Sequence, residues 1–89
     1  SGEVEDRLIY FYSESCPPCK QMTPIIDDLA TRHEKISKID VKRDPEAAKQ
    51  YKIRATPTLI LVKGGVIDDI LLGVKKATQI ENLLNKINR

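Results

Sequence analysis

The chain contains two cysteines, and both lie in the segment Cys16-Pro17-Pro18-Cys19. Two thiols at this spacing can form a reversible disulfide, and the thiolate is the attacking species in thiol–disulfide exchange. A bridge that closes so short a loop removes little conformational entropy from the unfolded chain, because that gain grows with loop length. The pair is therefore poorly placed as a structural staple, and its spacing favours redox chemistry.

The position of the pair predicts a different role for each sulfur. Cys16 lies where a helix is expected to begin, and unpaired N–H groups and the helix dipole stabilise an anion there. We therefore expect the pKa of Cys16 to fall below that of a free thiol, and we expect Cys16 to attack. Cys19, one turn further along and more shielded, is the expected resolving thiol. Because Pro17 and Pro18 lack N–H groups, the Cys19 N–H is the donor that remains for the Cys16 sulfur.

Other interpretations of the cysteines fit less well. A zinc site needs about four ligands, and this chain offers only the two cysteines and one histidine, His33. A zinc or iron–sulfur site shared across a dimer is less strongly excluded. Two structural thiols are a further alternative, although an exposed helix start beside two prolines is not a usual core position. We expect His33 on the surface, no metal, and no cofactor beyond the redox-active Cys16–Cys19 disulfide.

The elements that must position the cysteines flank them directly. The apolar and aromatic run Leu8-Ile9-Tyr10-Phe11-Tyr12, within residues 7–13, predicts a buried strand that ends just before the pair. From Pro17 to about Arg32, apolar side chains recur at helical spacing. Pro24 falls inside this helix and is expected to kink it.

Five further elements follow. Asp44-Pro45-Glu46 is a helix-start pattern, Lys63-Gly64-Gly65 predicts a hairpin turn, and Thr78-Gln79-Ile80-Glu81 predicts a capping box. The expected elements are strands over 36–41, 58–62 and 66–72, a short helix ending near Tyr51, and a last helix with Ile80, Leu83, Leu84 and Ile87 on one face. The order β-α-β-α-β-β-α predicts an α/β fold, with a parallel, right-handed first βαβ unit and an antiparallel hairpin. We expect a four-stranded mixed sheet flanked by three helices.

Length, composition and charge limit the class of protein. The chain has 89 residues, of which 40% are hydrophobic and 31% charged, and we expect one domain over 7–89 after a tail at 1–6. Ser1-Gly2 looks like a cloning remnant, which leaves open a removed leader. The net charge is +2, and the Lys and Arg residues occur along the chain with no basic run that has interleaved aromatics, which argues against nucleic acid as the main partner. No apolar run approaches the roughly 20 residues that span a bilayer.

From Leu8 to the C-terminus, the residues resemble the thioredoxin family. The segment Phe11–Lys20 is similar to the active-site segment of that family, and Ile53–Thr58 is similar to its cis-proline segment. The other matches are Pro24 with the helix-kinking proline, Lys38 with a strand lysine near the dithiol, Gly65 with the hairpin glycine, and Gly73 with a glycine beside the substrate groove. Cys-x-x-Cys alone is a weak signal, but with Thr56-Pro57 and Gly73 in register it is strong.

The resemblance implies a minimal thioredoxin-like fold and a protein-disulfide reductase. It implies a cis Thr56–Pro57 bond that keeps Pro57 against the cysteines, although a trans proline at a strand entrance is the alternative. The substrate groove would be formed by Ser15, Pro17, Pro18, Thr56, Pro57 and Gly73, and the Thr56 backbone could pair with an extended substrate strand. The implied partners are disulfide-containing proteins and a thioredoxin-reductase-like recycling enzyme. A cytoplasmic monomer is expected, with no nucleic acid and no membrane as partner.

The sequence also departs from the family. The first strand and helix of the family are missing, so the chain resembles the minimal core of the fold and is nearer to glutaredoxin in size. Ser15 replaces the usual Trp, and Tyr10 replaces a buried acid thought to help deprotonate the resolving thiol. A tyrosine, with an ordinary pKa of about 10, is a poor base at neutral pH. Water, Lys38 and the Tyr10 hydroxyl are candidates for this role, and core packing is the alternative for Tyr10.

Three rival functions stay open. A glutathione-dependent glutaredoxin is suggested by the short length and by Gly64-Gly65 with Asp68-Asp69, but the usual Tyr before Cys19 is missing and the glycine pair falls in the hairpin turn. A disulfide oxidase or isomerase is compatible with Thr56 before Pro57, and the reduction potential would distinguish it. A non-catalytic binding module on the same fold would keep its function after Cys16→Ser.

Overall fold

The predicted order of elements is present in the structure. The computed structural model describes residues 5–88. Its elements are β1 (Arg7–Tyr12), α1 (Pro17–Ala30), β2 (Ile36–Asp40), α2 (Pro45–Gln50), β3 (Thr58–Lys63), β4 (Val66–Leu72) and α3 (Ala77–Leu84). Residues 1–4 of the expected tail, with Ser1-Gly2, lie outside the described residues.

The four strands form one mixed sheet in the order β2-β1-β3-β4. The central strand β1 runs parallel to β2 and antiparallel to β3, and β3 and β4 form the antiparallel hairpin. Because side chains alternate across a strand, Leu8 and Tyr10 enter one core cluster while Ile9 and Phe11 enter the other. This explains why β1 reads as a continuous apolar run, since both of its faces are covered.

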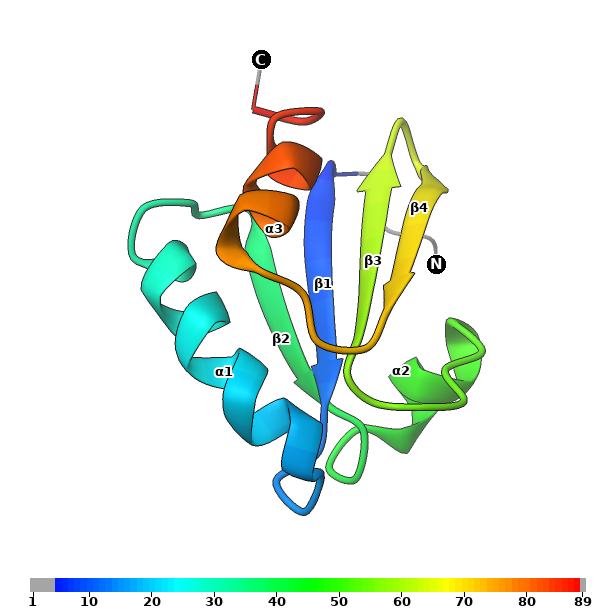
Figure 1. Cartoon of the computed structure of the whole chain (residues 1–89). Helices are drawn as coiled ribbons and strands as arrows, with labels where there is room; N and C mark the ends of the chain where they lie inside the picture. The colour runs from blue at the N-terminus through cyan, green and yellow to red at the C-terminus, as the bar shows by residue number, and fades with distance from the viewer. Residues whose placement is uncertain (1–4, 89) are drawn as a thin grey trace.

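Helices cover the two faces of the sheet unequally. α1 and α3 lie on one face and α2 lies on the other (Figure 1). The cluster under α1 and α3 includes Met22, Ile26, Ile80 and Leu84, all with no exposed surface. On the opposite face, Tyr51 and Ile53, which follow α2, pack on the second cluster. The predicted fold class is therefore confirmed, including the three flanking helices.

The strand register brings distant segments to one end of the sheet. Tyr12 at the end of β1 pairs with Asp40 at the end of β2, and Thr58 at the start of β3 pairs with Phe11. Leu72 at the end of β4 pairs with Thr58. The loops that follow β1, β2 and β4 and the loop that precedes β3 therefore meet at the same edge, which is the lower end of the sheet in Figure 1.

The start of the last helix differs from the prediction. α3 begins at Ala77 with Lys76 as its N-cap, so Thr78 lies inside the helix and does not cap it. The Gln79 side-chain oxygen accepts a hydrogen bond from the Lys76 N–H at 3.0 Å, and this bond satisfies one of the free donors at the helix start. Pro24 lies inside α1 as expected, and the kink there stays a prediction. None of the helices within residues 5–88 is long and apolar enough to span a membrane.

Candidate active site

The two cysteines form a disulfide at the first turn of α1. Cys16 and Cys19 are bonded, with their Cα atoms 5.2 Å apart. Cys16 is the N-cap residue of α1, with an extended backbone, and its Sγ accepts a hydrogen bond from the Cys19 N–H at 3.2 Å. The predicted helix-start position of Cys16 and the predicted Cys19 donor are both confirmed. The helix places a backbone donor where a Cys16 thiolate would carry its charge.

The two sulfurs differ in access to solvent. Cys19 is 1% exposed and belongs to the core, whereas Cys16 is half-buried. The three neighbours Ser15, Pro17 and Pro18 are exposed around Cys16. An incoming disulfide can therefore reach Cys16 more readily than Cys19, and the roles of attacking and resolving thiol stay a prediction.

The loop before β3 lies against Cys16. The Thr56–Pro57 peptide bond is cis, as predicted, and the Thr56 carbonyl oxygen lies 3.4 Å from Cys16 Sγ. A disulfide sulfur carries no proton, so this is a contact in the oxidised form. The Gly73 N–H donates to the Pro57 carbonyl at 3.0 Å, which holds the end of β4 beside this loop. Thr56 thus lies beside Cys16 although the two are far apart in the sequence, and Gly73 is held next to Pro57, the residue that follows Thr56.

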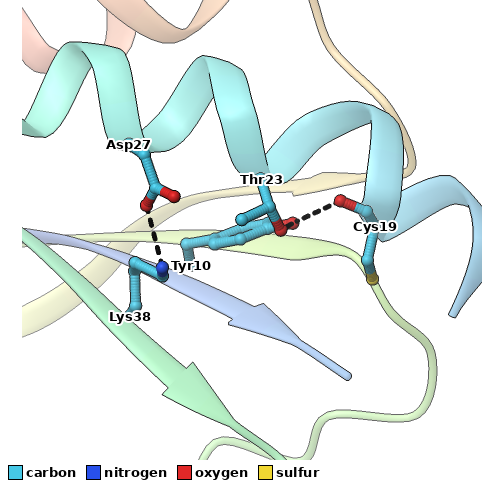
Figure 2. Close-up of polar contacts among 5 residues, drawn as sticks. All are labelled: Tyr10, Cys19, Thr23, Asp27 and Lys38. Atoms are coloured by element: carbon cyan, nitrogen blue, oxygen red, sulfur yellow. Dashed lines mark hydrogen bonds and ion pairs between the residues drawn. The ribbon is translucent and has the colours of Figure 1, made fainter. Parts of the chain in front are cut away.

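Tyr10 points from β1 toward α1 and contacts the backbone of the resolving cysteine (Figure 2). Its hydroxyl donates to the Cys19 carbonyl at 3.4 Å and shares a 2.9 Å hydrogen bond with Thr23 Oγ1. The Cys19 sulfur points away from this hydroxyl (Figure 2). Burial raises the pKa of Tyr10 above its ordinary value, because the phenolate would lose its solvation. The hydroxyl therefore stays protonated at neutral pH.

Lys38 lies on β2 and binds a carboxylate of α1. Its Nζ is 2.8 Å from Asp27 Oδ1 and 5.3 Å from the centre of the Tyr12 ring. The hydrogen bond to Asp27 raises the pKa of Lys38 above its ordinary value. Lys38 therefore stays an ammonium ion at neutral pH, so neither it nor Tyr10 is suited to take the proton of Cys19.

Sequence reasoning missed Thr23 and Asp27. Cys19, Thr23 and Asp27 follow one another at intervals of four residues, which places them on one stripe of the helix. That spacing, together with the helix predicted from Pro17, was the available signal. It shows that the stripe facing Tyr10 and Lys38 carries polar side chains as well as the resolving cysteine.

Two surface hollows flank the dithiol. The Cys16 hollow, of about 300 Å³, is formed by residues 13, 15–16, 41–42, 48 and 53–56. The Cys19 hollow, of about 410 Å³, is formed by residues 12–14, 19–20, 23–24 and 38. The larger hollow of about 520 Å³ near Glu5, Asp6 and Arg7 lies at the opposite end of β1. The two hollows beside the cysteines are therefore the ones relevant to exchange chemistry.

Some residues singled out by the sequence lie elsewhere. Gly64 and Gly65 form the β3–β4 turn, at the end of β3 away from Cys16, and Asp68 and Asp69 form ion pairs with Lys86. His33 Nδ1 lies 3.1 Å from the Asn88 amide nitrogen. In the part of the chain that the structure describes, no group of three or more His, Cys, Asp or Glu side chains could hold a metal ion.

The mixed four-stranded sheet carries a disulfide at the start of α1, and a cis-proline loop lies beside that disulfide. This combination of fold and site defines a thiol–disulfide oxidoreductase of the thioredoxin type. The thioredoxin family model matches residues 2–86, and the chain belongs to the thioredoxin family. It is a protein-disulfide reductase of that family, with a redox-active Cys-x-x-Cys pair.

Known thioredoxins align with most of the chain. The thioredoxin of Chlamydia trachomatis is 38% identical over 81 residues, which cover 89% of this chain and 79% of that protein. Thioredoxin 1 of Nostoc is 34% identical over 82 residues, covering 89% of this chain and 77% of the relative. A solved thioredoxin variant from Halobacterium salinarum superposes with a TM-score of 0.84 at 27% identity, covering 96% of this chain and 76% of that one.

Proposed function

We propose that the chain reduces disulfides of partner proteins with Cys16 as the attacking thiol and Cys19 as the resolving thiol. The observation that supports this most directly is the asymmetry between the sulfurs: Cys16 is accessible at a helix N-cap and accepts a backbone hydrogen bond, while Cys19 is 1% exposed. Anion stabilisation at the helix start lowers the cost of forming the Cys16 thiolate. The accessible sulfur is then also the more nucleophilic one at neutral pH.

The exchange proceeds in two displacements. In the first, the Cys16 thiolate attacks one sulfur of the substrate disulfide, forms a mixed disulfide and releases the other substrate sulfur as a thiolate. In the second, Cys19 loses its proton and attacks the Cys16 sulfur, which releases the second substrate thiolate and forms the Cys16–Cys19 bridge. The substrate gains two electrons and the chain loses two. A thioredoxin-reductase-like enzyme restores the dithiol.

The docking groove comprises Ser15, Pro17, Pro18, Thr56, Pro57 and Gly73. Its support is the exposure of Ser15, Pro17 and Pro18 around Cys16 and the 3.0 Å hydrogen bond that ties Gly73 to Pro57. An extended substrate segment would pair with the Thr56 backbone while its disulfide lies over Cys16. The protein would act as a monomer in a reducing compartment such as the cytoplasm.

Water is the acceptor of the Cys19 proton in this proposal. The Tyr10 hydroxyl contacts the Cys19 carbonyl at 3.4 Å, and Lys38 is held by Asp27 at 2.8 Å. Both side chains keep their protons at neutral pH because their pKa values are raised. Lys38 tunes the step as a cation, since it lines the Cys19 hollow together with Cys19 and favours the thiolate electrostatically.

Trapping of the mixed disulfide tests this proposal. A Cys19→Ser variant lacks the resolving thiol, so disulfide-containing proteins should stay attached to Cys16 until a reductant is added. The matched Cys16→Ser variant should attach none, because its remaining thiol is buried. Equal trapping by both variants, or trapping by neither, would refute the assigned roles.

Turnover of a glutathione mixed disulfide distinguishes the proposed protein-disulfide reductase from a glutaredoxin. The proposal expects reduction of protein disulfides that depends on both cysteines. Efficient turnover of the glutathione substrate by the Cys19→Ser variant would favour the rival, because that route needs only Cys16.

A further inference from the structure

We propose that the Cys16 hollow selects partner proteins whose disulfide is flanked by acidic residues. This inference rests on the proposed function and adds the chemical class of the substrate. Among the residues that line the Cys16 hollow, the ionisable side chains other than the cysteine are Lys42 and Arg54. Both are cations, and both are exposed. A docked segment would therefore meet positive charge directly beside the attacking sulfur.

Lys42 and Arg54 are not paired with a carboxylate in the part of the chain that the structure describes. The nearby carboxylates are already engaged: Asp40 accepts from the Lys42 N–H at 2.9 Å and pairs with Arg43 at 3.8 Å, and Asp44 caps α2 by accepting from the Ala47 N–H at 3.1 Å. The charges of Lys42 and Arg54 thus remain free for a ligand.

The net positive charge of the chain lies in the segment that forms one side of the Cys16 hollow. Residues 40–54 contain five Lys and Arg residues and three Asp and Glu residues, so this segment accounts for the whole net charge of +2. On the other side of the dithiol, the Cys19 hollow adds Lys20 and the Asp27-bound Lys38, with Glu14 as the single carboxylate lining either hollow. The surface around the cysteines is therefore cationic, while the rest of the chain is balanced.

The position of the cations indicates an extended protein segment as the occupant. Lys42 follows β2 and Arg54 precedes the Thr56-Pro57 loop, so the two cations lie on segments at the edge where all the site loops meet. A strand paired with the Thr56 backbone would place side chains of alternate residues along this edge. Asp or Glu near the substrate cystine would then pair with Lys42 and Arg54. Complementary charge raises the association rate and suppresses partners of like charge.

The test measures the oxidation of the reduced protein by three disulfide peptides of one backbone sequence, with Glu, Gln or Lys on both sides of the cystine. Each second-order rate constant is divided by that of a small neutral thiol with the same peptide, which corrects for the intrinsic reactivity of the disulfide. At low salt the acidic peptide should react about tenfold faster than the basic one on this scale, and the difference should shrink at high salt.

Charge-reversal variants localise the effect. Lys42→Glu combined with Arg54→Glu should reverse the order of the peptides. Each rate is compared with that of the Gln peptide on the same variant, because two carboxylates beside Cys16 also change the reactivity of its thiolate. The matched control is Arg32→Glu with Lys63→Glu, which changes the net charge equally at the opposite end of the molecule. It should keep the acidic preference.

Equal corrected rates for the three peptides would overturn the inference, and so would a reversal of the peptide order by the control pair. A third contrary result is a faster reaction with glutathione disulfide than with the acidic peptide that is lost when Lys42 and Arg54 are replaced. The last result would assign the hollow to a small anionic thiol. Failure of the proposed function is distinguishable, because the reduced protein would then be oxidised by none of the peptides, including the Gln peptide.

Discussion

Tyr10 has no exposed surface, yet its hydroxyl has two partners on α1. The sequence predicted that this residue lies on the first strand, and it left open whether the hydroxyl acts as a base or the ring simply packs. The hydrogen bonds to Thr23 and to the Cys19 carbonyl support a third role, in which Tyr10 holds the backbone of the resolving cysteine. Such long-range partners depend on how α1 packs over β1, which no local pattern of residues specifies.

Tyr10→Phe should therefore lower the free energy of unfolding by about 1 kcal/mol at pH 7, while disulfide reduction stays within a fewfold of the original rate. The raised pKa also has a pH signature. The stabilising contribution of the neutral phenol is present below its ordinary pKa of 10.0 and is lost as the pH rises through the higher folded value. The parent protein should thus lose more stability above about pH 10 than the variant does.

Urea unfolding at pH 7, 9, 10 and 11 measures both effects. Tyr12→Phe serves as a control on the same strand, because Tyr12 is only half-buried and stacks against Tyr10 at 5.3 Å. A collapse of reductase activity in a folded Tyr10→Phe protein would contradict this role and support the hydroxyl as a proton acceptor.

Lys38 and Asp27 should affect the resolving step in opposite directions. Lys38→Gln removes a cation from the Cys19 hollow and should slow the release of substrate from the Cys16 mixed disulfide several-fold, whereas Asp27→Asn removes the counter-charge and should speed it. Because these side chains are 33% and 53% exposed, either change should cost less than about 1 kcal/mol in stability. Rapid mixing measures the rate at which the Cys16 mixed disulfide decays in each variant. Equal rates in the two variants would contradict this expectation.

Among the elements, α2 is short and ends in a conformation that its sequence does not favour. Lys52 has a φ of 57°, and its N–H donates to the Lys49 carbonyl at 3.1 Å while the Ile53 N–H donates to the Ala48 carbonyl at 2.8 Å. These two bonds form a Schellman motif, whose left-handed position is usually glycine. The start of α2 was predictable from Asp44-Pro45-Glu46, and its predicted end near Tyr51 agrees with the structure. The left-handed cap at Lys52 was not predictable, because a lysine gives no signal for that conformation.

Lys52→Gly should therefore stabilise the protein by up to about 1 kcal/mol, since a left-handed conformation costs a side-chain-bearing residue roughly that much. Lys49→Gly, inside the same helix, should instead destabilise it by about 1 kcal/mol. Denaturant unfolding of both variants provides the comparison. Destabilisation by Lys52→Gly would contradict this expectation. It would show that the Lys52 side chain stabilises the fold by more than its left-handed backbone conformation costs.

Local sequence patterns explain which helices and strands could be predicted. The β1 and β3 strands and α1 have continuous apolar or periodic patterns, so their identity and approximate limits were predictable. The start of α3 was misplaced because Thr78-Gln79-Ile80-Glu81 fits the capping-box pattern, whereas in the folded chain Lys76 is the N-cap residue and its N–H donates to Gln79. Lys76 has no side-chain oxygen that could cap the helix, so its N-cap position gave no signal in the sequence.

At the scale of the whole molecule, sheet register assembles the site. Cys16, Thr56-Pro57 and Gly73 could be placed together in advance only through resemblance to the thioredoxin family, because their contacts join the ends of β1, β3 and β4. The clustering of the net charge in residues 40–54 was visible in the sequence. Its position beside Cys16 was not, since it depends on the pairing of β1 with β2.

Oxidation state should change global stability only modestly. The Cys16–Cys19 bridge closes a loop with a sequence separation of 3, so loop entropy predicts that the oxidised protein is more stable than the dithiol by about 2 kcal/mol. Urea unfolding with and without a reductant measures the difference, and the Cys16→Ala, Cys19→Ala double variant should not respond to the reductant. A dithiol form that fails to fold would contradict this expectation and make the bridge a structural staple.

The pH dependence of alkylation is the most direct test of the whole account. The reduced protein is treated with iodoacetamide between pH 4 and 10, and the modified cysteine is identified by mass spectrometry. Cys16 should react first, with a midpoint below the value of about 8.5 for a free thiol, while Cys19 reacts far more slowly. A Cys16 midpoint at or above that of a free thiol, or earlier modification of Cys19, would contradict the claim that the helix start creates the attacking thiolate.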